Sequence, residues 1–510
     1  MNIWRRNLIG RVVQISVAAI VLATLMNGCR GNYGDLNTTT GSTRADFLSS
    51  GRTQSFFTAI QVDPKSEDSA GPQFVIAEDL DGDGLLDLVS AWNQSQPVQI
   101  HLQKRGASGE IRFETVTLAG NTPVVAVAGL AVADLDRDGR LDIIMLLKQT
   151  LLPDAGCLDS ETPEAEGLSG LILVYLGPSD PTQVDQALAW VEVPIEASRL
   201  QGAGSVTGST EVGGFTSFAV GDMDLDGDID IVAAWNSNCG GPEGTADAVL
   251  FTNQGGAAVR DGTWTAARIP NSVPVGTRIT DVALGDIDLD GDLDVVAVFP
   301  DAASMNIRWF RNPVIDVPDN FHVADATWQV GIVTQIATQA EIIRLADIDQ
   351  DARLDIVVRS SAGGLIQWLK GPGENSTSVS VGNIPWQVYT IAEFRGRAPS
   401  AIALGDINFD GQLELIAAAE GGLAWFDSQG PATIFDQWTE NLIVDDGSVA
   451  TDPNVDPDDL AGSTLINSIR VVDLDGDGAN DLVATFDRNG LSGLTNDALV
   501  WFRNTRRPPR

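Results

Sequence analysis

The sequence predicts an all-β fold, a seven-bladed β-propeller made of four-stranded antiparallel blades. An aspartate-rich motif occurs seven times in the 510 residues, and an aromatic strand follows each copy. The copies start on average about 66 residues apart, a period that suits a blade of several short strands. Glycine is abundant, with 52 residues, as expected where turns join many short strands.

The repeated motif reads Asp-x-Asp-x-Asp-Gly-x-x-Asp, and its residues are numbered here as positions one to nine. Small apolar residues precede the motif and a β-rich run follows it, so it is expected to form the turn between two strands. The residues at positions one, three, five and nine are, copy by copy, Asp79, Asp81, Asp83 and Asp87; Asp134, Asp136, Asp138 and Asp142; Asp222, Asp224, Asp226 and Asp230; Asp286, Asp288, Asp290 and Asp294; Asp347, Asp349, Asp351 and Asp355; Asp406, Asn408, Asp410 and Glu414; and Asp473, Asp475, Asp477 and Asp481.

The order of strands within one repeat follows from the fourth copy. Strand one, Val282–Asp286, leads into the motif, and strand two, Leu293–Val298, leaves it. Strand three carries Trp309 and Phe310, and a further strand opens with Trp328. The same order recurs along the chain, which predicts four antiparallel strands per blade and buried strand-three aromatics between blades.

The ring is expected to close through the N-terminal part of the chain. The last repeat ends on its third strand, Ala498–Arg503, and so lacks a fourth. The segment Ser55–Val62 precedes the first motif and has no other strand to pair with. We expect it to complete the last blade, because a closed ring leaves no unpaired sheet edge between the ends of the array.

These motifs resemble the FG-GAP/VCBS repeat family, whose fold is that of the integrin α-subunit head. The resemblance covers nearly all of residues 55–504. It implies a seven-bladed propeller with calcium in the turn between strands one and two. The family includes bacterial surface proteins and some sugar-binding propellers, so the resemblance does not identify a ligand.

The chemistry of the motif is consistent with calcium, a hard cation that takes six to eight oxygen ligands. Carboxylates at positions one, three, five and nine supply oxygens, glycine at six permits the bend, and position seven is expected to offer its backbone carbonyl. Without metal, carboxylates roughly 5 Å apart repel by about 3 kcal/mol per pair at an effective dielectric near 20. We expect up to seven structural calcium ions.

Two copies depart from the pattern and are expected to be the weakest sites. The fifth has Ala352 at position six, which costs about 1 kcal/mol if that residue has a positive φ. The sixth has Asn408 and Glu414 where other copies have aspartate, so it carries one charge fewer.

The N-terminus has the features of an export signal. A basic start at Arg5, Arg6 and Arg11 is followed by the mostly apolar run Val12–Met26, which is short for a membrane span. The run ends in Leu-Met-Asn-Gly-Cys29, which resembles a bacterial lipobox with Cys29 as the lipidated residue; cleavage and release is the alternative.

Four segments are therefore expected along the chain. They are a signal peptide at 1–29, a polar tether at 30–54, the propeller at 55–504 and a tail at 505–510. The protein is expected in the bacterial periplasm, in the outer membrane or at the cell surface, with the lipid as its only membrane attachment.

Charge narrows the classes of partner. The formal net charge is −39, with 70 acidic and 31 basic residues, which argues against nucleic acid and anionic membrane surfaces. We expect a monomer that binds a protein or a polysaccharide.

Other residues permit weaker hypotheses. Trp92 and Trp235 end strand two on the face opposite the motif, where they either stack on a sugar or pack in the core. Cys157 and Cys239 lie in the strand two-to-three loops of neighbouring blades and could form a disulfide. His101 and His322 lie in strand-like contexts and are expected to be structural.

Three functions remain open from the sequence. The first is a non-catalytic interaction platform at the cell surface. The second is a lectin-like propeller with repeated sugar pockets. The third is a polysaccharide lyase or hydrolase on a propeller scaffold, because the many carboxylates leave room for an acidic catalytic pair. The chain has no zinc-protease helix motif, Gly-x-Ser-x-Gly elbow or phosphate-binding glycine loop.

Overall fold

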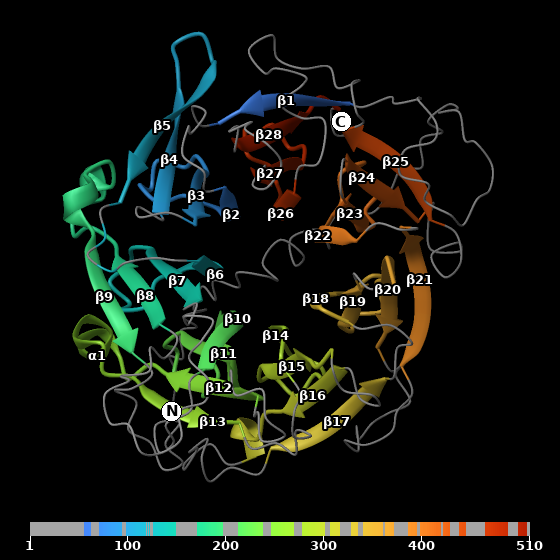
Figure 1. Ribbon diagram of the computed structural model, residues 1–510. Coiled ribbons are helices and arrows are strands. Elements are labelled where there is room, and N and C mark those ends of the chain that lie inside the picture. Colours follow the sequence, from blue (N-terminus) through green and yellow to red (C-terminus); the bar gives the residue numbers. More distant parts are fainter. Residues whose placement is uncertain are drawn as a thin grey trace, which may run out of the picture.

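A computed structural model of the chain gives its architecture (Figure 1). The structure describes residues 56–62, 71–93, 98–118, 120, 122, 126–148, 171–196, 213–237, 246–269, 278–300, 307–316, 328–334, 340–360, 363–371, 386–394, 398–419, 422–428, 438–444, 465–487 and 498–506. The predictions for Cys29, Cys157, Cys239 and His322, for the signal peptide and for the tether lie outside these residues.

The described strands form seven four-stranded antiparallel sheets arranged in a ring, which confirms the predicted fold class (Figure 1). From the centre outwards, the strands are β2 (Pro72–Glu78), β3 (Asp87–Trp92), β4 (Val98–Arg105) and β5 (Ile111–Thr117) in blade 1; β6 (Ala126–Ala133), β7 (Asp142–Lys148), β8 (Leu171–Leu176) and β9 (Val191–Glu196) in blade 2; β10 (Gly213–Gly221), β11 (Asp230–Ser237), β12 (Ala246–Thr252) and β13 (Thr265–Arg268) in blade 3; β14 (Asp281–Gly285), β15 (Asp294–Val298), β16 (Ile307–Arg311) and β17 (Gln329–Thr334) in blade 4; β18 (Ile342–Ala346), β19 (Asp355–Ser360), β20 (Leu365–Lys370) and β21 (Gln387–Glu393) in blade 5; β22 (Pro399–Gly405), β23 (Glu414–Ala419), β24 (Gly422–Asp427) and β25 (Thr439–Val444) in blade 6; and β26 (Leu465–Val472), β27 (Asp481–Asp487), β28 (Ala498–Asn504) and β1 (Phe57–Gln61) in blade 7.

The N-terminal strand closes the ring, as the sequence predicts. β1 pairs antiparallel with β28, in a register that runs from Phe57 opposite Asn504 to Gln61 opposite Val500. Next to this ladder, the amide of Thr505 donates to the carbonyl of Phe56 at 2.8 Å. The first and last described strands therefore share one blade, and an opening of the ring would have to break this sheet.

The hydrophobic core lies between neighbouring blades. Strand-three aromatic side chains are buried there, including Trp368 in blade 5 and Trp501 in blade 7. Trp368 belongs to the same apolar cluster as Leu415 and Phe426 of blade 6, so the cluster joins two sheets. Fully burying a large apolar side chain contributes about 1.5–3 kcal/mol, and the interface repeats around the ring.

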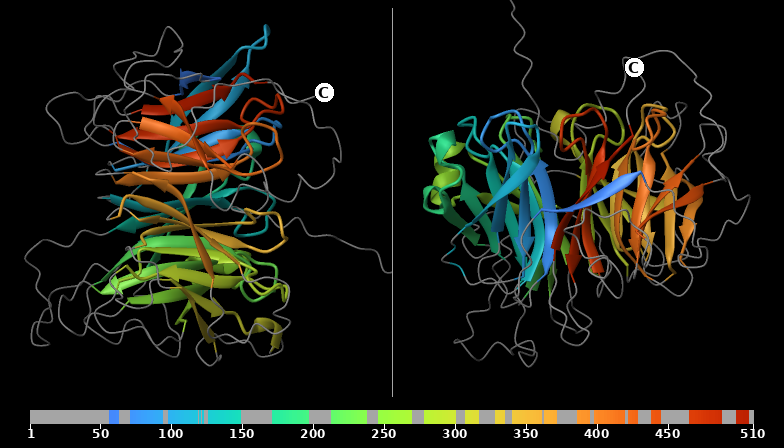
Figure 2. Two further views of the ribbon diagram at one scale, coloured as in Figure 1. Left: turned by 90° about the vertical axis from the view of Figure 1, so that its right-hand side faces the viewer. Right: turned by 90° about the horizontal axis from the view of Figure 1, so that it is seen from above.

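Helical elements are few and short in the part of the chain that the structure describes. They are helix α1 (Gly256–Asp261) and the 3₁₀ turns η2 (Pro181–Gln183), η3 (Ala187–Ala189) and η5 (Val314–Asp316). None of the described helices is long and apolar enough to cross a membrane. Seen from its edge, the ring has strands that run between its two faces (Figure 2), and connections between strands lie at these faces.

Candidate metal centres

The aspartate motif occupies the turn between the first and second strands of every blade. Position nine is the first residue of the second strand, as Asp87 is of β3. Since each blade has the same strand order, all seven turns lie on one face of the ring. The residues at position nine are buried in all seven blades: Asp87, Asp142, Asp230, Asp294, Asp355, Glu414 and Asp481.

Each turn contains two residues with a left-handed backbone. Position six has φ between 82° and 102° in the six copies with glycine, and Ala352 has φ 67°. The conditional prediction of a positive φ at Ala352 is therefore confirmed. Position four also has a positive φ, between 57° and 73° in all seven blades, although five copies carry a side chain there: Arg137, Leu225, Leu289, Gln350 and Phe409. Sequence analysis missed position four, and glycine at 82 and 476 was the only signal for it.

Carboxylates at positions one and five fold the turn by accepting backbone hydrogen bonds. In blade 1, the amide of Gly84 donates to Asp79 Oδ2 at 3.0 Å, and the amide of Leu85 donates to Asp83 Oδ1 at 2.9 Å. Blade 5 repeats both bonds, from Ala352 to Asp347 Oδ2 at 2.8 Å and from Arg353 to Asp351 Oδ1 at 3.1 Å. These bonds fix the direction of the two side chains.

The carboxylate at position nine connects the turn to strand three. In blade 1, the amide of Leu80 donates to Asp87 Oδ2 at 3.0 Å and that of Gln103 donates to Asp87 Oδ1 at 2.8 Å. Burial raises the pKa of Asp87 to about 7, although the two backbone hydrogen bonds lower it. Burial likewise raises the pKa of Asp230 to about 8 and that of Glu414 to about 9. A nearby divalent cation would reverse this effect, because it favours the ionised carboxylate.

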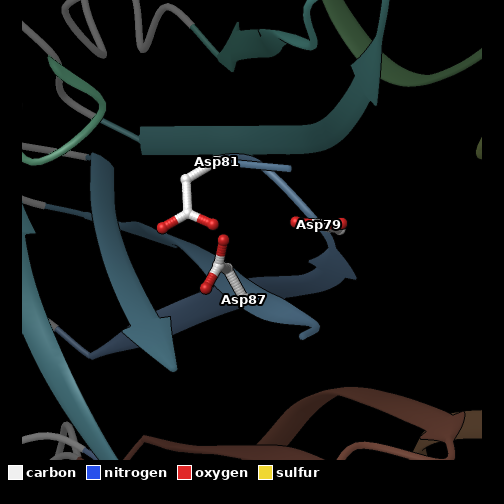
Figure 3. Close-up of side chains that lie close together, drawn as sticks. All are labelled: Asp79, Asp81 and Asp87. Atoms are coloured by element: carbon white, nitrogen blue, oxygen red, sulfur yellow. The ribbon is translucent and has the colours of Figure 1, made fainter. Parts of the chain in front are cut away.

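Oxygens of the motif converge in the described turns. One oxygen from each of Asp79, Asp81 and Asp87 lies within 4.8 Å of the others, and the same holds for positions one, three and nine in blades 2 and 3 and for positions one, three and five in blades 4 and 5. Figure 3 shows the carboxylates of Asp81 and Asp87 facing each other, with that of Asp79 beside them. Oxygen donors at such a spacing are suited to a hard cation such as calcium.

Buried oxygens without a hydrogen-bond donor provide a second indication of a metal site. Within the described residues, the Oδ1 atoms of Asp136, Asp288 and Asp349 are buried and accept no hydrogen bond. All three stand at position three, in blades 2, 4 and 5. A buried acceptor without a donor is costly unless a cation lies beside it. The residues present therefore fit a bound calcium ion.

Position seven, which was expected to offer its backbone carbonyl, also contributes side chains to the turn. Asp228 and Asp292 are buried against their own turns, so blades 3 and 4 each have a fifth carboxylate. Asp292 Oδ1 is buried and has no hydrogen-bond donor among the described residues. In blade 6, the position-seven side chain Gln412 instead accepts a hydrogen bond from Ser428 Oγ at 2.9 Å.

Buried amide side chains connect the turns of neighbouring blades. Asn312 of blade 4 donates from Nδ2 to the carbonyl of Met223 in the turn of blade 3, at 2.8 Å, and to Leu293 of its own turn, at 3.1 Å. Its backbone amide donates to Asp294 Oδ1 at 2.8 Å. We call such a residue an inter-blade latch. The other latches are Asn253 from blade 3 to blade 2, Asn504 from blade 7 to blade 6, and Gln103 from blade 1 to blade 7.

The tryptophans suggested as a sugar-binding face do not form one. Trp92 and Trp235 are 0% and 2% exposed, so neither indole presents a face to solvent. Trp92 donates from Nε1 to Ser90 Oγ at 2.8 Å, and Trp235 lies in the core cluster that joins blades 2 and 3. Both tryptophans therefore pack in the core, which was the alternative to sugar stacking.

His101 is structural, as expected. It is buried, and its two ring nitrogens lie at hydrogen-bond distance from Ser90 Oγ, 2.8 Å, and Thr115 Oγ1, 3.0 Å. Burial lowers the pKa of His101 to about 3, so the ring is neutral at physiological pH.

Comparisons with known proteins agree with the repeat pattern. A model of the FG-GAP-like repeat matches residues 79–145, 222–297 and 347–417. A search of curated proteins finds no match. Among solved structures, the chain is similar to two crystal structures described as BBS1N in complex with ARL6DN, soaked with lead and with mercury. The first is 12% identical and covers 90% of this chain and 100% of its own, with a TM-score of 0.47. The second is 13% identical and covers 89% and 99%, with a TM-score of 0.46.

Proposed function

Because the chain is an FG-GAP repeat β-propeller, we propose that it is an exported, calcium-loaded interaction platform with no catalytic activity of its own. The observation that carries the calcium part is the buried acidic residue at position nine, which is present in all seven blades and in blades 1 to 3 lies within a set of converging oxygens. Burying seven such groups is unfavourable unless positive charge accompanies them.

Calcium suits the motif better than other common metals. The turns offer carboxylates and backbone carbonyls but no histidine or cysteine, which zinc and most transition metals prefer. Calcium accepts six to eight oxygens in a flexible geometry, whereas magnesium requires a tighter octahedron. When bound, calcium would supply the positive charge that the buried carboxylates lack.

The role of the metal in this proposal is structural. Position-nine carboxylates join the turn to strand three through two backbone hydrogen bonds, so a cation held there stiffens the whole blade. A rigid ring displays its connecting loops in fixed positions, which suits a binding scaffold. On the metal face, Leu225 and Leu289 in neighbouring blades expose 46% and 50% of their surface, and so offer apolar contacts to a partner.

We propose a protein or a polysaccharide as the partner, and the cell envelope as the location. The net charge of −39 disfavours polyanions, and the lipobox-like Cys29 provides an anchor that leaves the propeller outside the bilayer. Trp92 and Trp235, which could have stacked on a sugar, are buried and therefore lend no support to the lectin alternative with its repeated sugar pockets.

Calcium binding is tested by metal analysis and calorimetry on the purified full chain. We expect several equivalents of calcium to remain bound at millimolar concentration, and EDTA to lower the unfolding temperature. Failure to retain calcium, together with identical melting in EDTA, would reject the proposal. The partner class is tested on a glycan array and by cross-linking to envelope proteins, each with and without chelator.

A further inference from the structure

The turns of blades 4, 5 and 7 each contain a positive charge supplied by the protein. Arg311 contacts Asp288 Oδ2 through Nε and Asp290 Oδ2 through Nη2, both at 2.6 Å. Lys370 Nζ contacts Asp349 and, at 2.7 Å, Asp351 Oδ2. Arg503 Nη2 lies 2.5 Å from Asp475 Oδ2 and 3.8 Å from Asp477 Oδ2. In each blade the cation bridges positions three and five.

These three cations stand at one structural position. Arg311, Lys370 and Arg503 each follow the strand-three residue that pairs with the residue after position nine; the pairs are Phe310 with Val295, Leu369 with Ile356, and Phe502 with Leu482. The arrangement therefore recurs with the repeat. We call a cation that bridges positions three and five a counter-ion residue.

Blades 1 and 2 reach the same result from other positions. In blade 1, Lys104 Nζ lies 2.6 Å from Asp81 Oδ2 and 3.5 Å from Asp83 Oδ2. In blade 2, Arg260 of helix α1 reaches across from blade 3 to contact Asp136 and, at 3.2 Å, Asp138 Oδ2. Three unrelated chain positions thus place a cation over the same two carboxylates.

Blades 3 and 6 differ from the other five. Thr252 and Asp427 stand where blades 4, 5 and 7 have a cation. Among the described residues, no cation forms an ion pair with positions one, three, five or nine of these two turns. Arg137 reaches only the position-seven residue of blade 3, Asp228, at 3.2 Å. Blade 6 also has one carboxylate fewer, because Asn408 stands at position three.

The counter-ion residues leave room for a metal. Arg311 and Lys370 contact the Oδ2 atoms at position three, while the Oδ1 atoms of Asp288 and Asp349 are buried and have no hydrogen-bond donor among the described residues. A metal held by Oδ1 would lie a few ångströms from the protein's own cation. At about 5 Å in a water-like dielectric, one and two positive charges repel enough to weaken binding on the order of tenfold, and a lower dielectric increases the effect.

We propose that the seven turns form two classes of calcium site, a tight site in blade 3 and weaker sites in the other six blades, because five of these contain a counter-ion residue and the turn of blade 6 carries one carboxylate fewer. The counter-ion residue offsets part of the carboxylate repulsion before metal binds, so these turns depend less on calcium for folding. This inference rests on the proposed calcium binding and adds which sites fill first.

The test is calcium titration by calorimetry on the full chain, after removal of metal. We expect one site to fill at least about tenfold more tightly than the others. Arg311→Met removes the cation of blade 4 and should give a second tight site, together with a larger loss of unfolding temperature in EDTA. Thr252→Arg supplies the missing cation in blade 3 and should remove the tight site. Arg311→Lys keeps the charge and should titrate like the unaltered protein.

Matched controls come from an exposed ion pair on β5. Arg112 and Glu114 lie 3.2 Å apart with side chains 66% and 56% exposed, and among the described ion pairs neither contacts a carboxylate of a turn. Arg112→Met and Glu114→Gln change the net charge as the two test variants do, and should leave both classes unchanged. Seven equal sites, or weaker binding in Arg311→Met, would overturn this inference while leaving calcium binding intact. A complete lack of calcium binding would reject the proposed function itself.

Discussion

Replacement of Ala352 by glycine should stabilise the protein, because this is the one copy of the motif with a side chain at position six. Ala352 has φ 67°, a conformation that costs an L-residue about 1–2 kcal/mol. Glycine removes that cost but loses about 0.4–1 kcal/mol through the greater freedom of the unfolded chain. The Ala352 methyl group is exposed, so no buried contact is lost. The hydrogen bond from the Ala352 amide to Asp347 remains available.

The expected net gain is therefore about 0.5–1 kcal/mol in the free energy of unfolding. Urea unfolding at saturating calcium measures it as a higher midpoint with an unchanged slope. Gly291→Ala in blade 4 is the reciprocal control. Gly291 has φ 102°, and a Cβ atom there would meet nothing within 4 Å, so that variant tests the backbone alone. It should lower the midpoint. A midpoint that falls or stays constant in Ala352→Gly would refute the reasoning.

Further predictions concern the described contacts and, for three cysteines, the sequence alone. First, burial raises the pKa of Asp87 to about 7 and that of Asp230 to about 8, above the usual value near 4. Metal-free protein should therefore lose stability as pH rises from about 4 to 8, and the gain in unfolding temperature on adding calcium should grow over the same window. A gain in unfolding temperature that is independent of pH would contradict this prediction. Second, Asn312→Ala removes a buried hydrogen bond to blade 3 and a partly buried one within blade 4, and should cost about 1–3 kcal/mol in urea unfolding. The exposed variant Glu114→Gln should be neutral. Third, Cys29→Ser should abolish labelling by a radioactive or clickable fatty acid. Fourth, mass spectrometry of non-reduced peptides should find Cys157 joined to Cys239, and free thiols at both residues would reject the disulfide.

The repeat made much of this fold predictable. Each motif fixes the same turn, so the seven blades could be counted from sequence, and the unpaired segment Ser55–Val62 could be assigned to the last blade. The strand-three tryptophans recur at one position, so their burial was also foreseeable. Repetition worked because every copy reports on the same local structure.

Features that depend on the neighbouring chain could not be predicted in this way. Trp92 ends β3 and Trp235 lies near the end of β11, so both looked accessible, but they are buried. Arg311 lies 23 residues after Asp288, and only the antiparallel pairing of β15 with β16 brings the two together. Position four was hidden for a different reason, since residues as unlike as Leu225 and Gln350 occupy one backbone conformation that their chemistry does not reveal.

The inter-blade latches have a consequence for how the ring responds to its ions. Latches join blades 2, 3 and 4 into one arc and blades 6, 7 and 1 into another, while Gly371 and Ser428 replace them on either side of blade 5. In an array of similar units, coupling between nearest neighbours decides how far a local event spreads. Filling one turn should therefore assist the rest of its arc directly, and blade 5 only through contacts other than latches, such as the bond from Gln350 to the carbonyl of Gly411 in blade 6. The propeller is thus expected to load as two cooperative arcs, each with one turn that lacks a counter-ion residue.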